Sequence, residues 1–97
     1  MKVYFSALAQ KELQEAVTYY DEISSSLGDE LVREVEQAER RILSFPLAWS
    51  TVGEEQRKYV LPRFPYLILY KVYCDRVVIA AFAHQHRPPE NYINREQ

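Results

Sequence analysis

The feature that most constrains this chain is a change in the spacing of its apolar residues at Pro46. Before Pro46, apolar residues recur every three or four positions, which places them on one face of a helix. The first series is Ala9, Leu13, Ala16, Val17, Tyr20 and Ile23. The second is Leu27, Leu31, Val35, Ala38, Ile42 and Phe45. Pro46 ends the second helix because proline disfavours helical backbone in the residue before it. We expect helices over about residues 7–24 and 27–45.

After a loop at residues 46–56 the pattern becomes typical of strands. Three runs rich in Val, Ile, Leu and Tyr follow: Arg57 to Leu61, Tyr66 to Tyr73 and Arg76 to Ala83. Cys74-Asp75 is short enough to be the turn of an antiparallel hairpin. Lys2 to Phe5 is a further short strand, and Ser6 is a candidate N-cap for the first helix.

This order of elements predicts an α+β domain with the sequence β-α-α-β-β-β. We expect the two helices to form an antiparallel hairpin on one face of a small antiparallel sheet, with residues 66–73 as the middle strand. The other face is then partly exposed, or a partner covers it.

Length and composition indicate a single domain over residues 1–97, with a flexible tail from about residue 88. No apolar run approaches the roughly 20 residues of a membrane span, and the N-terminus lacks the apolar segment of a signal peptide. The single cysteine, Cys74, excludes an internal disulfide and fits a reducing compartment. We therefore expect a cytoplasmic protein with no membrane association.

Charge is distributed unevenly along the chain. Residues 1–56 hold five Lys/Arg and eleven Asp/Glu, a net of −6, whereas residues 57–97 hold seven and three, a net of +4. A basic half of this kind can meet an anion or an acidic partner. The acidic excess is also what two helices with solvated outer faces would carry.

The sequence contains few residues suited to catalysis or metal binding. Two glycines cannot build a phosphate-cradling loop. His84 and His86 are two apart at the end of the last strand, so they point the same way, but a metal site needs a third ligand that the sequence nearby does not supply. We expect no metal and no cofactor. These histidines could carry protons or contact RNA, or they could be ordinary surface residues.

The basic residues of the second half form a candidate surface for nucleic acid or another target. They are Arg57, Lys58, Arg63 and Arg87. Arginine suits bidentate contact with phosphate, and Tyr92, five residues after Arg87, could stack on a base. Basic residues at strand edges also protect a sheet from pairing with another chain, so this interpretation stays open.

Several segments resemble toxins of the RelE/ParE family. Arg57-Lys58-Tyr59-Val60-Leu61-Pro62-Arg63-Phe64-Pro65-Tyr66 followed by an apolar strand ending in Tyr70 is similar to the middle of those proteins. The run Val77 to Pro88, with His84-Gln85-His86-Arg87, is similar to the family's last strand and the residues after it. Upstream, Ala9-x-x-Glu12-Leu13-x-x-Ala16-x-x-Tyr19-Tyr20 and Ile42-x-x-Phe45-Pro46 are similar to the two family helices. The resemblance covers residues 2–92.

This resemblance implies a toxin of a type II toxin–antitoxin module, neutralised by a cognate antitoxin with which it could form a hetero-oligomer. Members of the ParE branch poison DNA gyrase, and the Phe64-Pro65-Tyr66 segment and the helix pattern are closer to that branch. Members of the RelE branch cleave messenger RNA on the ribosome. A non-toxic binding module, such as a degenerate toxin, is a third possibility.

The RelE alternative implies particular catalytic residues. Arg57, Arg63 and Arg87 would stabilise the charge on phosphate, and Tyr92, His84 or His86 would transfer protons. Alternatively, Arg57 and Arg87 pair with acidic groups of the antitoxin or cap the sheet.

Overall fold

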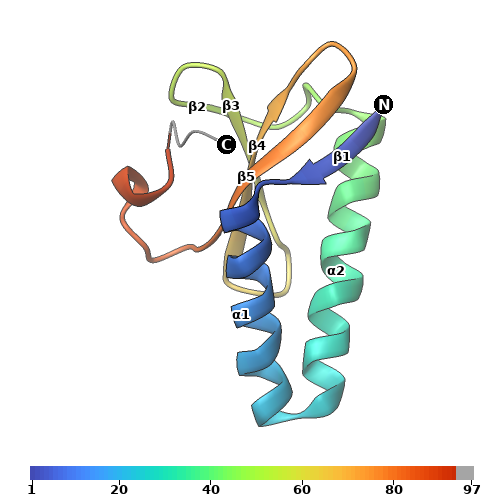
Figure 1. Ribbon diagram of the computed structural model, residues 1–97, viewed down its shortest axis with the longest axis vertical. Coiled ribbons are helices and arrows are strands. Elements are labelled where there is room, and N and C mark those ends of the chain that lie inside the picture. Colours follow the sequence, from blue (N-terminus) through green and yellow to red (C-terminus); the bar gives the residue numbers. More distant parts are fainter. Residues whose placement is uncertain (94–97) are drawn as a thin grey trace.

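Two helices lie side by side on one face of a five-stranded sheet (Figure 1). In this computed structural model, which describes residues 1–93, α1 spans Ala7–Ile23 and α2 spans Ser25–Ser44. Both helices agree with the predicted ranges to within two residues. Ser6 caps α1 as predicted, since its hydroxyl oxygen accepts a hydrogen bond from the Ala9 amide at 3.1 Å.

The strands follow the predicted order, with one short addition. They are β1 (Lys2–Phe5), β2 (Thr51–Val52), β3 (Gln56–Val60), β4 (Tyr66–Val72) and β5 (Arg76–His84). Their order in the sheet is β1-β5-β4-β3-β2, so β4 is the middle strand as predicted. The two-residue β2 was not expected, because the sequence at 46–56 has no strand-like run.

The predicted antiparallel sheet needs one correction: the sheet is mixed. β2 to β5 pair antiparallel, but β1 pairs with β5 in parallel, with Lys2 opposite Arg76 and Phe5 opposite Ile79. Only Ser6 separates β1 from α1. Because α1 packs on the sheet beyond the end of β1, β1 must run towards it, and this direction is parallel to β5. The Ser6 amide then donates to the Ile79 carbonyl at 2.9 Å and extends the pairing into the helix cap.

A β-bulge changes which side chains of β5 face the helices. Leu69 lies opposite Ala81 while Tyr70 lies opposite Ile79, so β5 has one extra residue, Ala80, at this point. Val77 and Ile79 before the bulge, and Phe82 after it, all belong to the core under the helices. The bulge therefore also turns His84, two residues after Phe82, towards the α1 side.

The main core lies between the helices and the sheet. Its fully buried members include Leu31 and Ile42 from α2, and Ile68 and Tyr70 from β4. Strand alternation thus places Tyr66, Ile68, Tyr70 and Val72 towards the helices and Leu67 and Leu69 on the opposite face.

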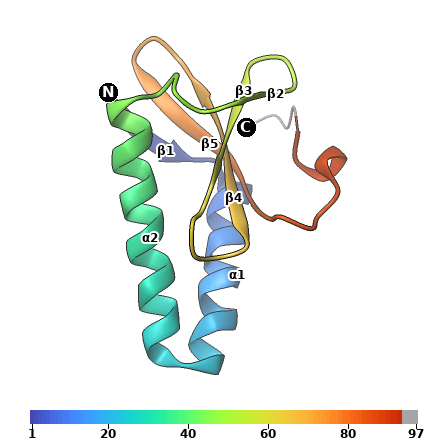
Figure 2. The ribbon, with the colours of Figure 1, turned by 180° about the vertical axis from the view of Figure 1, so that it is seen from behind.

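The opposite face of the sheet is partly covered by the chain itself. After β5 a short 3₁₀ helix spans Pro89–Asn91, and Tyr92, only 5% exposed, packs in a second cluster with Leu67, Leu69, Ala81 and Ala83. Figures 1 and 2 show this segment and the helices on different sides of the sheet. The sequence predicts a flexible tail from about residue 88. Within its described part, to Ile93, the Tyr92 ring is buried and covers apolar sheet surface, while residues 88–91 are exposed. Residues 94–97 lie outside the described residues.

Within residues 1–93, none of the helices combines the length and the apolar character that crossing a membrane requires.

Candidate functional site

Two of the predicted site residues, His84 and Arg87, line a cavity where α1 passes β5, and His86 lies beside His84. This cavity has a volume of about 250 Å³. Its lining is Glu12, Glu15, Ala16, Tyr19, Tyr66, Phe82, His84 and Arg87. We call this region the α1–β5 corner.

Glu12 organises this corner through both oxygens of its carboxylate. Oε1 accepts a hydrogen bond from the Phe82 amide at 3.1 Å, and Oε2 lies 2.8 Å from Nη1 of Arg87. β1 pairs with β5 only as far as Ile79, so a side chain from α1 binds the Phe82 amide. The Glu12 side chain is only 9% exposed, whereas that of Arg87 is 41% exposed. The guanidinium is thus held at the rim of the cavity.

Aromatic rings form the floor of the corner. Tyr66 stacks on Phe82 with ring centroids 4.8 Å apart and meets His84 edge-on at 5.2 Å. Burial raises the pKa of Tyr66, with Tyr20 and Tyr19 adding to the rise and Arg87 opposing it, so its hydroxyl stays neutral. The corner therefore combines an aromatic floor, one ion pair and a neutral phenol.

The two histidine rings lie side by side, with His84 at the end of β5 and His86 in the turn that follows it. Their ring centroids are 5.1 Å apart, and Nδ1 of His84 accepts a hydrogen bond from the His86 amide at 3.2 Å. No group of three or more His, Cys, Asp or Glu suited to a metal ion occurs among residues 1–93.

Arg57 lies elsewhere, on β3 near the end of α2. Its Nη1 donates to two backbone carbonyls, those of Leu47 at 3.0 Å and Trp49 at 2.7 Å. This guanidinium holds the loop between α2 and β2 against the sheet.

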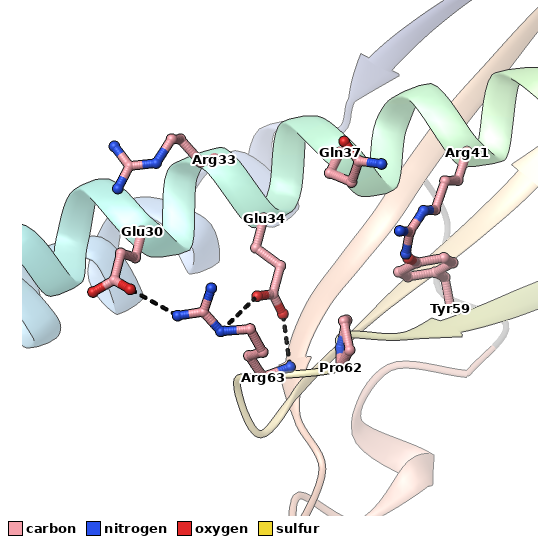
Figure 3. Close-up of a pocket in the computed structure, with 8 residues that line it drawn as sticks. All are labelled: Glu30, Arg33, Glu34, Gln37, Arg41, Tyr59, Pro62 and Arg63. Carbon is pink, nitrogen blue, oxygen red and sulfur yellow. Dashed lines mark hydrogen bonds and ion pairs between the residues drawn. The ribbon is translucent and has the colours of Figure 1, made fainter.

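Arg63 lies on the outer side of α2, in the loop between β3 and β4. Its guanidinium is 2.7 Å from Glu30 and 3.9 Å from Glu34, and its own amide donates to Glu34 at 2.9 Å. Figure 3 shows these contacts along a groove that continues to Arg41 and Tyr59. Arg63 therefore joins the β3–β4 loop to α2.

Lys58 and Tyr92 belong to the opposite face of the sheet. Tyr59 faces the helices, so the neighbouring Lys58 points away from them. The Tyr92 ring is buried in the second cluster and does not reach the α1–β5 corner.

The structure thus brings together His84, His86 and Arg87 and separates them from Arg57, Arg63 and Tyr92. Each of the three arginines makes internal hydrogen bonds, two of them with glutamates. Transition-state stabilisation on phosphate needs cations that converge on one point, and this arrangement does not provide that convergence.

Glu12 is the site residue to which sequence reasoning assigned no role. The sequence does indicate that Glu12 lies on the buried face of α1, because it is three residues after Ala9 and four before Ala16, both of which are buried. A carboxylate on that helix face must meet a donor or a cation.

Comparison with known proteins agrees with this architecture. The family described as ParE toxin of type II toxin-antitoxin system, parDE, matches residues 3–89. Comparison with curated protein sequences finds no match. Among solved structures, a chain of the chromosomal ParDE TA system from P. aeruginosa is similar in fold, with a TM-score of 0.63 and 12% sequence identity. That similarity covers 87% of this chain and 95% of the other. Because the family match extends over most of the sequence, the chain belongs to the ParE toxin family of type II toxin–antitoxin systems.

Proposed function

We propose that this toxin acts by binding and inhibiting DNA gyrase, without nuclease chemistry of its own. The observation that carries the proposal is the dispersal of the candidate catalytic residues. Arg57 binds loop carbonyls, Arg63 binds glutamates of α2, and Tyr92 is buried on the far face of the sheet. A binding protein needs no convergent set of cations and proton carriers, so this arrangement supports the gyrase branch of the family.

We further propose that a cognate antitoxin neutralises this toxin. β1 is an edge strand, and its outer edge offers backbone groups for strand addition. Beside it, Tyr4 is 50% exposed and Leu8, at the start of α1, is 48% exposed. A segment that pairs with β1 would cover both side chains. Size-exclusion chromatography of the toxin co-expressed with the product of the neighbouring gene tests this. Separate elution of the two proteins would contradict it.

Induction of the chain alone in a bacterial host tests the main proposal. Gyrase poisoning predicts growth arrest with DNA-damage signalling, and the purified chain should block supercoiling of plasmid DNA by purified gyrase. Growth arrest with rapid loss of translation and cut transcripts would support the RelE-like alternative instead. Normal growth at confirmed expression would leave a non-toxic binding module.

The RelE-like alternative has one observation in its favour, the grouping of His84, His86 and Arg87. If the chain cleaves RNA there, His84→Ala and Arg87→Ala should each lower the cleavage rate by on the order of 10²–10³. Circular dichroism would establish that both variants are folded. Unchanged cleavage in both would remove these residues from any active site.

A further inference from the structure

The loop that follows α2 presents two large apolar side chains to solvent. Phe45 and Leu47 are each 65% exposed, the highest values among the large apolar residues of the described chain. We call this pair the apolar knob. Burying two such side chains in a partner would remove apolar surface from water and stabilise the complex.

The backbone beneath the knob is held firmly, although its side chains are exposed. Arg57 binds the carbonyls of Leu47 and Trp49, and the Tyr70 hydroxyl donates to the carbonyl of Pro46 at 2.8 Å. The Trp49 ring packs against Tyr59 with centroids 5.0 Å apart. A loop fixed before binding loses little conformational entropy when a partner binds it, which favours affinity.

Positive charge flanks the knob. The Arg57 guanidinium binds backbone carbonyls, and Nη1 of Arg41, on the last turn of α2, donates to the Tyr59 hydroxyl at 2.9 Å. Within the described residues, neither guanidinium has a carboxylate within ion-pair distance, in contrast to Arg63, Arg76 and Arg87. The complementary partner surface is therefore an apolar pocket with acidic groups at its rim.

We propose that the apolar knob inserts into such a pocket on the folded enzyme that the toxin inhibits, which by the proposed function is gyrase. The knob is convex and preorganised, so it fits a pocket already formed in a folded protein. An antitoxin segment that adds to a strand edge would use the backbone of β1. Arg41 and Arg57 then steer the toxin to the acidic rim and fix its orientation.

The double variant Phe45→Ser/Leu47→Ser tests this proposal. A hot-spot residue at the centre of an interface contributes at least about 2 kcal/mol, which corresponds to roughly 30-fold in affinity. We expect the concentration that half-inhibits gyrase supercoiling to rise by at least about 100-fold. Ile23→Ser is the matched control, because Ile23 is 58% exposed and ends α1. Figure 1 shows that the α1–α2 connection lies at the other end of the molecule from the loop after α2. The control should inhibit gyrase as the parent does.

Growth arrest on induction separates the failure of this inference from the failure of the proposed function. If the parent arrests growth but does not inhibit gyrase, the target is another protein, and loss of arrest in the double variant still supports the knob. If the folded double variant arrests growth and inhibits gyrase as the parent does, the inference is wrong. Loss of antitoxin binding with full toxicity would overturn it too and assign the knob to the antitoxin. A parent with neither activity would overturn both proposals.

Discussion

The α1–β5 corner and the loop after α2 both depend on an arginine, but they use it in opposite ways. At the corner, Arg87 pairs with Glu12, whose other oxygen binds the Phe82 amide. The cation there neutralises a carboxylate that is mostly buried. At the loop, Arg57 donates to carbonyls and has no carboxylate within ion-pair distance among residues 1–93, while burial raises the pKa of Tyr70 and keeps its hydroxyl a donor to Pro46.

This difference indicates which region is available to a partner. At the corner, Glu12 and Arg87 already bind each other, so a ligand that needs either charge must first break this pair. In the loop after α2, hydrogen bonds from Arg57 and Tyr70 fix the backbone. The two apolar side chains of the knob and the positive charge remain available to a partner. A protein–protein contact would bury these exposed apolar side chains and give the neighbouring positive charge a partner.

The largest expected effect in this comparison comes from Glu12→Ala. The substitution removes the acceptor of the Phe82 amide in the partly buried corner, and an unsatisfied donor of this kind costs about 2 kcal/mol. Urea denaturation should show that decrease in the free energy of unfolding.

Glu12→Gln is the matched control for this prediction. Its amide oxygen can still accept from Phe82, while the ion pair with the partly exposed Arg87 is lost, which costs less than about 1 kcal/mol. Equal destabilisation by the two variants would mean that the ion pair, and not the amide contact, holds the corner together.

A smaller effect is expected from Arg57→Ala, which removes the hydrogen bonds to Leu47 and Trp49. We expect a loss of about 1.5 kcal/mol in the free energy of unfolding and a loop that is no longer fixed. Trp49 is the single tryptophan of the chain, so its fluorescence reports on this loop directly. Acrylamide should quench it more strongly in the variant.

Arg57→Lys provides the comparison for that loop. A lysine ammonium keeps the charge but lacks the planar fork that spans two carbonyls. Quenching should therefore lie between the parent and Arg57→Ala. Parent-like quenching in Arg57→Ala would contradict the claim that Arg57 fixes the loop.

Local patterns predicted most of the fold. The two helical series and Pro46 gave helix ranges correct to within two residues, because apolar spacing and proline act on neighbouring residues. The parallel pairing of β1 and the bulge at Ala80 were not predicted, since both depend on how distant segments meet. Tyr92 was placed in a flexible tail for the same reason: the surface that it covers is formed by β4 and β5.

The site was less predictable than the fold. The rings of His84 and His86 are adjacent, but His86 lies in the turn after β5, so the turn and not strand alternation brings them together. The partners of Arg57, Arg63 and Arg87 are 8 to 75 residues away in sequence, so the sequence did not reveal that they make internal contacts. An arginine bound to a carbonyl and one available to phosphate have the same sequence signature.

The smallest effect is expected at Glu39, on the last turns of α2 before the loop. Burial raises its pKa above the ordinary value of 4.5; Glu36 adds to the rise, and Arg40 opposes it. The stability linked to this group is therefore fully present below about pH 4.5 and is lost as the pH rises through the raised value. Glu39→Gln removes that loss, so the variant should gain slightly on the parent between acidic and neutral pH, by less than about 0.5 kcal/mol. Urea denaturation across this pH range measures the difference in the free energy of unfolding. Glu22→Gln, at an exposed position on α1, is the control for the loss of one surface carboxylate. If Glu39→Gln is instead less stable at neutral pH, the attraction of Arg40 outweighs the effect of burial at Glu39, and the expected sign is wrong.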